Sequence, residues 1–190
     1  MPLIDHFNLL APIYEIFIKP KKPEELMARM DLPVEGALLD AGGGTGRVSQ
    51  FLDGHAVGVV VADQSCRMLE EARGKPGLRP VCGETENLPF PDGFFARIIM
   101  VDALHHVASQ RETIDELWRV LRPGGRMVIE EPDLRSLVVK LVALGEKLAL
   151  MRSHFLRPEE IVGLLDYPDV RVEVEYEGAI AYIIAVKRKS

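Results

Sequence analysis

Short apolar runs alternate with helical patterns over the first two thirds of this chain, and no other sequence feature constrains the fold as strongly. The runs predict strands at residues 37–41, 57–62, 79–82, 96–101 and 126–131. Helices are predicted between them at residues 46–52, 65–73 and 110–121, the last ending at the turn sequence RPGG of residues 122–125. Alternating strands and helices build βαβ units, which place their strands parallel in one sheet.

The C-terminal part of the chain follows another pattern. Residues 170–176 alternate apolar and charged side chains, whereas residues 179–187 are almost wholly apolar. Glu177 and Gly178 lie between these runs and predict a tight turn, so the two strands should form an antiparallel hairpin. The expected fold is therefore α/β, with an open, mostly parallel sheet of seven strands whose last strand is antiparallel.

Length and charge limit the classes of function. A chain of 190 residues, 47% of them hydrophobic, predicts one globular domain with a sizeable core. The net charge of −6 argues against a nucleic-acid partner, because phosphate binding needs a basic surface. The apolar stretch of residues 134–151 contains four charged side chains, so it predicts a half-buried helix and not a membrane span.

Cysteine usage bears on the cellular compartment. The two cysteines, Cys66 and Cys82, have neither the spacing of paired metal ligands nor the pattern of a disulfide framework. This pattern predicts a cytoplasmic protein. The chain also contains only five Asn and Gln residues, a composition that fits a heat-adapted source.

A glycine run, LLDAGGGTGR at residues 38–47, stands between the first predicted strand and a helix. Glycines there let a ligand approach the backbone, and a helix N-terminus attracts anionic groups, so the run favours a nucleotide-like ligand over a plain tight turn. A dinucleotide fingerprint would need a further glycine where Arg47 or Ser49 stands, which disfavours an NAD-dependent oxidoreductase. Asp63 ends the next predicted strand and could accept hydrogen bonds from both hydroxyls of a ribose.

Four blocks of sequence carry a family resemblance. They are LLDAGGGTGR, VVADQSCRMLEEAR, CGETENLPFPDGFFARIIMVDALHHV and LWRVLRPGGRMVI. In order and spacing they resemble the class I S-adenosylmethionine-dependent methyltransferases, most of all the branch of the ubiquinone/menaquinone C-methyltransferases. The resemblance implies a Rossmann-like methyltransferase fold with helices on both faces of the sheet. It also implies one domain, with an N-terminal helical arm over the site (1–30), a cofactor-binding core (36–131) and substrate-side helices with a C-terminal hairpin (132–190).

The resemblance also implies which residues hold the cofactor, S-adenosyl-L-methionine, and its product, S-adenosyl-L-homocysteine. Asp40 would lie near the amino group of the cofactor, and Gly42 and Gly44 would pass under its methionine portion. Asp63 would accept hydrogen bonds from the ribose diol.

The adenine ring would be held by two other segments. Gln64 and Met68 match the adenine wall of the family, although Met68 also suits an ordinary core position of its helix. Glu84 matches the acid that accepts a hydrogen bond from the exocyclic amine, at a position where many relatives have Asp, and Thr85 would offer its backbone N–H to the ring.

Asp102, His105 and His106 follow the fourth predicted strand, at the edge of the sheet where ligands of such folds bind. We expect His105 to act as a base if the acceptor must lose a proton, because imidazole titrates near neutral pH. A structural turn is the alternative. A second alternative is a divalent metal held by the three residues, if they share one face of a helix. We expect no metal.

Tyr14 matches a tyrosine of the family that approaches the cofactor as the site closes, so with His105 it completes the expected catalytic residues. The acceptor should be a small, apolar or amphipathic molecule, and the protein a monomer or homodimer without integral membrane association. The leading function is methyl transfer. The alternatives are a protein that binds S-adenosylmethionine or S-adenosylhomocysteine without catalysis and, less favoured, an NAD-dependent oxidoreductase.

Overall fold

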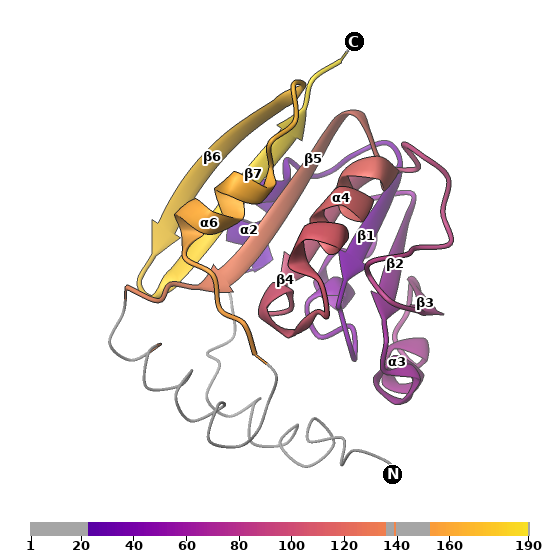
Figure 1. Ribbon diagram of the computed structural model, residues 1–190. Helices are drawn as coiled ribbons and strands as arrows, with labels where there is room; N and C mark the ends of the chain where they lie inside the picture. Colours follow the sequence, from indigo (N-terminus) through magenta and orange to yellow (C-terminus); the bar gives the residue numbers. More distant parts are fainter. Residues whose placement is uncertain (1–22, 136–138, 140–152, 190) are drawn as a thin grey trace.

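The computed structural model describes residues 23–135, 139 and 153–189. These residues form a seven-stranded sheet with the order β3-β2-β1-β4-β5-β7-β6 (Figure 1). The strands are β1 (Ala37–Ala41), β2 (Gly58–Asp63), β3 (Leu78–Cys82), β4 (Phe95–Val101), β5 (Leu121–Pro132), β6 (Val170–Glu177) and β7 (Ile180–Lys187).

Strand directions confirm the predicted sheet. β1 pairs in parallel with both β2 and β4, and β3 and β5 extend the parallel part on either side. β7 runs antiparallel to β5 and to β6. Gly178, with a φ of +60°, supplies the left-handed residue of the turn that joins β6 to β7.

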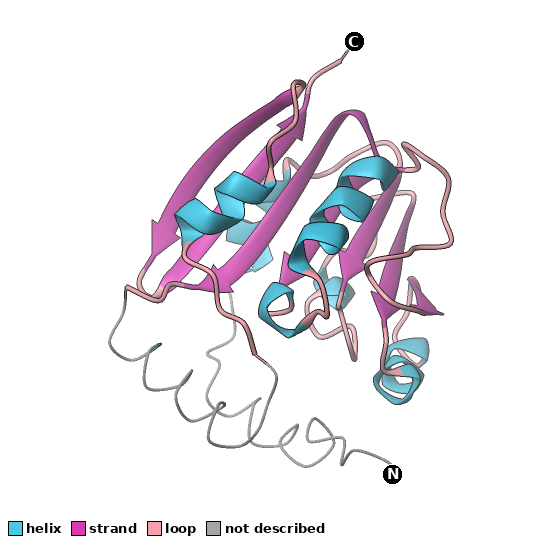
Figure 2. Cartoon of the chain, viewed as in Figure 1, coloured by secondary structure: helices cyan, strands magenta, loops and turns pink. Residues whose placement is uncertain are grey.

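Helices cover both faces of the sheet, as expected (Figure 2). They are α2 (Pro23–Met30), α3 (Cys66–Arg73), α4 (Gln110–Val120) and α6 (Pro158–Leu164), with the short 3-10 helices η1 (Ser49–Phe51) and η2 (Leu104–His106). α4 and α6 pack with Leu39 and Val60 on one face, whereas α2 and α3 pack with Leu38 and Val59 on the other. Successive strand residues point to opposite faces, so burial of both faces explains the unbroken apolar runs.

Two predicted elements have different bounds in the structure. The helix expected at residues 46–52 is a series of turns ending in η1. Gly46 has a φ of +70°, so it is not part of a right-handed helix, and the N–H groups of Phe51 and Leu52 donate to carbonyl oxygens three residues back. The RPGG sequence ends α4 as expected but then belongs to β5, which begins at Leu121. The pairing of β4 with β5 shifts its register opposite this sequence.

Two predicted segments fall partly or wholly outside the described residues. Residues 1–22 of the expected N-terminal arm lie outside the described residues. α2, which follows them, packs on the sheet through Leu26 and Met30. Most of the helix expected at residues 134–151 is also not described. Within the described ranges, no helix is long and apolar enough to cross a membrane.

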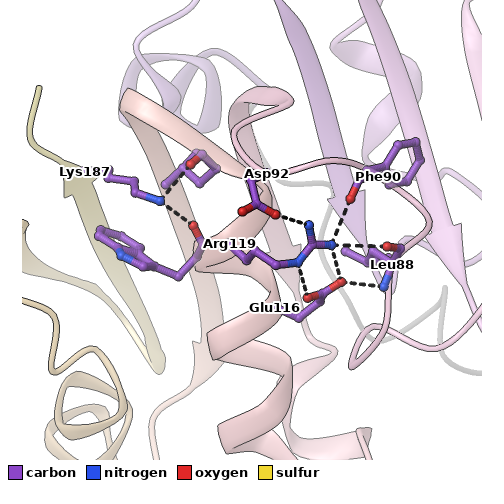
Figure 3. A network of polar contacts seen from close by, with 8 residues as sticks. Leu88, Phe90, Asp92, Glu116, Arg119 and Lys187 are labelled. Atoms are coloured by element: carbon purple, nitrogen blue, oxygen red, sulfur yellow. Dashed lines mark hydrogen bonds and ion pairs between the residues drawn. The ribbon is translucent and has the colours of Figure 1, made fainter. Parts of the chain in front are cut away.

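Arg119 of α4 joins two of the sequence blocks that carry the family resemblance (Figure 3). Its guanidinium donates hydrogen bonds to the carbonyl oxygens of Leu88 and Phe90 and pairs with Asp92 at 2.6 Å and Glu116 at 2.7 Å. Glu116 also accepts a hydrogen bond from the backbone N–H of Leu88 at 2.7 Å. The LPFPDG loop, which follows the predicted adenine segment, is thus held to α4 by charged hydrogen bonds.

The structure contradicts our expectation for the cysteines. Cys66, the first residue of α3, and Cys82, the last residue of β3, form a disulfide with a Cα–Cα distance of 5.3 Å. No local pattern predicts this bond, because the two residues are brought together only when β3 pairs in parallel with β2. The cysteine pattern therefore gives no support to a cytoplasmic location.

The disulfide closes a loop between residues separated by 16 positions, so its loss should destabilise the protein by about 2–4 kcal/mol. We expect the double variant Cys66→Ser, Cys82→Ser to unfold at a correspondingly lower guanidinium concentration than the oxidised protein. Reduced wild type should match the double variant, and reductant should not affect the variant. Alkylation of two thiols in the unreduced native protein would contradict the disulfide.

Candidate cofactor site and catalytic pair

The candidate site lies beside β1, where the order of the strands in the sheet reverses. From β1 the chain extends to β2 and β3 on one side, and β4 and β5 lie on the other. Ligands of open α/β sheets bind at the carboxyl ends of the strands at such a point. Gly42 and Gly44 follow β1, Asp63 ends β2, and His105 follows β4, so the structure brings these predicted residues to one edge of the sheet.

The glycine loop needs its glycines for two reasons. Gly42 and Gly44 have φ values of +71° and +53°, a region that other residues rarely adopt. Neighbouring atoms also leave no room for a side chain: a Cβ atom on Gly42 would lie 2.6 Å from Cβ of Ala103, and one on Gly44 would lie 2.6 Å from Cε of Met68. The backbone of the loop is therefore the surface that a ligand would meet.

Asp63 links the loop to the start of α3. Its Oδ2 accepts a hydrogen bond from the Gly44 N–H at 2.9 Å, and its Oδ1 accepts one from the Ser65 N–H at 2.7 Å. Burial raises the pKa of this carboxyl, while the two backbone hydrogen bonds lower it. The side chain is half-buried, so its other lone pairs can accept hydrogen bonds from a ligand.

Asp40 lies beneath the loop, on the side away from its open surface. It is buried, accepts a hydrogen bond from the hydroxyl of Ser49, and occupies the space that a Cβ atom on Gly43 would need. Burial raises its pKa to about 6. Asp40 therefore supports the loop from the protein interior.

The two predicted adenine segments lie side by side and are joined by the disulfide. Gln64 is exposed and Met68 is half-buried at the start of α3, where the side chain of Ser65 caps the helix. On the other segment Glu84 is exposed, whereas Thr85 is buried and shares a hydrogen bond between its hydroxyl and that of Thr113 at 3.3 Å.

His105 forms a buried pair with a residue that sequence reasoning missed. Its Nδ1 lies 2.5 Å from Oε2 of Glu131 at the end of β5. The other carboxylate oxygen of Glu131, Oε1, accepts hydrogen bonds from the backbone N–H groups of Ala103 at 3.1 Å and Leu104 at 2.8 Å. The exposed fractions of His105 and Glu131 are 1% and 3%.

The segment before α6 covers this pair. The ring of Phe155 stacks on that of His105, with centroids 4.2 Å apart and planes 16° from parallel. The N–H of His154 donates to the carbonyl oxygen of His105 at 2.8 Å, and the Gln110 side chain donates to the carbonyl oxygens of Leu104 and His154. The side chain of His154 is exposed, whereas its backbone N–H fixes the covering segment.

Asp102, His105 and His106 do not lie on one face of a helix. Asp102 has a φ of +52° and lies before η2, so the spacing on which the metal alternative rested is not realised. Within the described residues, no group of three or more His, Cys, Asp or Glu side chains could hold a metal ion. Burial, followed by the charge of His105, lowers the pKa of His106 to about 3, so this ring stays neutral near pH 7.

One signal in the sequence could have pointed to Glu131. Two adjacent acids, Glu130 and Glu131, end a predicted buried strand, where a charge needs a partner. No comparable sequence pattern pointed to Phe155 as a residue of the site. Tyr14, the other expected catalytic residue, lies outside the described residues.

Comparisons with known proteins identify the family of this chain. A methyltransferase-domain family model matches residues 39–129. The ubiquinone/menaquinone biosynthesis C-methyltransferase UbiE of Coxiella burnetii is 30% identical over 181 residues, covering 80% of this chain and 72% of the relative. The demethylmenaquinone methyltransferase of Paenarthrobacter aurescens is 37% identical over 103 residues, covering 54% of this chain and 41% of that protein.

Solved structures support the same fold. A methyltransferase structure from Thermotoga maritima, described as a possible histamine N-methyltransferase, superposes with a TM-score of 0.73 at 23% identity, covering 96% of this chain and 98% of that one. The fold is the Rossmann-like methyltransferase fold. The chain belongs to the class I S-adenosylmethionine-dependent methyltransferases, in the branch of the ubiquinone/menaquinone C-methyltransferases. It spans about two fifths to one half of the length of the demethylmenaquinone methyltransferases that it matches.

The variant Gly42→Ala tests the glycine loop. The left-handed backbone should cost roughly 1–2 kcal/mol with any other residue, and the clash with Ala103 should add roughly 1–3 kcal/mol. Gly178→Ala is the matched control, because Gly178 has a similar φ of +60° and a Cβ atom there would meet nothing within 4 Å. Guanidinium unfolding should show a larger loss for Gly42→Ala, and equal losses would contradict the close packing of loop and η2.

Proposed function

We propose that this protein transfers the methyl group of S-adenosylmethionine to a small acceptor of the quinol class. The observation that carries the proposal is the contact between two groups of residues at one edge of the sheet. The glycine loop with Asp63 forms one group, and His105 with Glu131 forms the other. Gly42 packs against Ala103, which lies two residues before His105, so the two groups are immediate neighbours.

The residues of the first group fit the cofactor. The bare backbone at Gly42 and Gly44 would lie under its methionine portion, and the Asp63 carboxylate would accept hydrogen bonds from the ribose hydroxyls. Gln64 and Met68 would line one side of the adenine, with Glu84 and the backbone N–H of Thr85 on the other. Asp40 would favour the ammonium group of the cofactor through its charge.

Catalysis would then depend on alignment, water exclusion and proton transfer. When bound, S-adenosylmethionine supplies a methyl group activated by the sulfonium. His105 would take the proton of the acceptor hydroxyl at Nε2, which makes the neighbouring ring carbon more nucleophilic. After that carbon has gained the methyl group, loss of its C–H proton and return of a proton from His105 to the oxygen would restore the quinol. Phe155 and the neighbouring backbone would keep water from this nitrogen, and the acceptor would enter past them. Tyr14 is proposed to approach the cofactor on the basis of the family resemblance alone.

The quinol class is suggested by the names of the two relatives and by the chemistry of the pair. A ring hydroxyl beside the accepting carbon gives His105 a proton to remove, and an aromatic ring can pack against Phe155. The proposed partner is thus a small molecule, and the net charge of −6 speaks against nucleic acid.

We also propose a cytoplasmic location, where S-adenosylmethionine is available. Disulfides are rare in that compartment, except in hyperthermophiles, whose intracellular proteins are rich in them. The Cys66–Cys82 bond and the low content of Asn and Gln together favour such a source.

Binding of S-adenosylhomocysteine tests the cofactor site with two isosteric variants. Asp63→Asn should weaken binding at least about tenfold, because it removes a charged acceptor that serves two ribose hydroxyls. Glu84→Gln should weaken it less, since Glu84 is exposed and its contact is single. Calorimetry measures both, under conditions where circular dichroism shows the variants to be folded. Equal affinity of Asp63→Asn and wild type would refute the ribose contact, and stabilisation by NAD alone would favour the oxidoreductase alternative.

Methyl transfer can be tested with labelled S-adenosylmethionine and a reduced, prenylated naphthoquinone that lacks the ring methyl group. Wild type should label this quinol, and His105→Ala should lower kcat by roughly 10²–10⁴-fold with unchanged affinity for S-adenosylhomocysteine. His106→Ala should have a smaller effect. Binding of the cofactor with no labelled product, either from the quinol or from a metabolite extract, would favour the binding protein without catalysis.

A further inference from the structure

The buried hydrogen bond between His105 and Glu131 has a defined donor and acceptor. Glu131 uses Oε1 to accept two backbone N–H groups, those of Ala103 and Leu104, so this oxygen is fixed in place. Its Oε2 is thereby directed at Nδ1 of His105, 2.5 Å away. A carboxylate can only accept hydrogen bonds, so the imidazole must carry a proton on Nδ1 to form this bond.

We infer that Glu131 is a positioning residue that selects the Nδ1–H tautomer of His105. This inference rests on the proposed function, because only a base needs one particular ring nitrogen. With the proton on Nδ1, the lone pair of the neutral ring is on Nε2, and that atom receives the proton of the acceptor. The carboxylate also stabilises the imidazolium that forms, as buried acids do in other acid–histidine pairs.

Three further contacts hold the pair in place. Phe155 stacks on the imidazole and fixes its plane. The carbonyl oxygen of His105 accepts the N–H of His154. Glu131 lies at the end of β5, whose register with β4 is set by parallel pairing up to Glu130 and Val101. A ring turned out of this plane would lose the stacking, and a ring flipped within it would lose the hydrogen bond to Glu131.

The same geometry predicts what Glu131→Gln would do. The two backbone N–H groups need an acceptor, so the amide oxygen of the glutamine takes the place of Oε1. Its NH₂ group must then face Nδ1 of His105 and donate to it. Nδ1 becomes an acceptor, the proton moves to Nε2, and the base loses the lone pair that it needs.

Nitrogen NMR of protein labelled in the histidine rings reads the tautomer directly and needs no methyl acceptor. Wild type near neutral pH should give a protonated Nδ1 and an unprotonated Nε2 for His105, assigned by the signals missing from His105→Gln. In Glu131→Gln, Nδ1 should be unprotonated and Nε2 protonated, whereas Glu131→Asp should retain the wild-type pattern. Glu116→Gln is the matched control, because Glu116 also accepts a backbone N–H but lies in the Arg119 network.

The Nε2–H tautomer in wild type, or an unchanged tautomer in Glu131→Gln, would overturn the inference. The wild-type measurement decides the point even if the glutamine variant does not fold. Where the quinol is labelled, Glu131→Gln should lower kcat by roughly 10²–10⁴-fold and leave the affinity for S-adenosylhomocysteine unchanged. Failure of the proposed function would instead appear as absence of S-adenosylhomocysteine binding or of methyl transfer, with the tautomer as inferred.

Discussion

The parallel pairing of β1 with strands on both of its sides is the constraint on which the rest of this structure depends. It makes β1 an interior strand of the sheet, with both faces covered by helices, and only apolar residues can fill such a strand over most of its length. It also forces the chain to leave β1 in a tight turn beside the ends of β2 and β4. The glycine loop, Asp63 and the η2 turn meet because of that pairing.

Local signals made much of this architecture predictable. The strand pattern predicted all seven strands to within a few residues, except that β5 begins five residues before its predicted start. RPGG is typical of a turn, but here it forms an irregularity within β5, where the register with β4 shifts. The prediction of a helix after the glycine loop was also wrong. Its hydrophobic pattern is helical, but the segment forms turns and the 3-10 helix η1, whose hydrogen bonds reach back three residues.

Contacts between distant segments were harder to predict. Cys66 and Cys82 are unremarkable in the sequence, and only the register of β2 with β3 brings them within bonding distance. Glu131 was missed in the same way, since its partner His105 lies 26 positions away on another strand end. Asp63 could be predicted because a single local rule, an acid at the end of the second strand, determines its position. Its two backbone hydrogen bonds became visible only in the structure.

The site consists of two halves, which meet where Gly42 contacts Ala103. The half formed by β1, β2 and β3 carries the residues proposed for the adenosyl cofactor, and the half formed by β4, β5 and the segment before α6 carries His105, Glu131 and Phe155. Residues of the second half can therefore diverge to suit new acceptors while the first half keeps one ligand. A lineage built on this plan can exchange the molecule that it modifies and inherit its methyl donor unchanged.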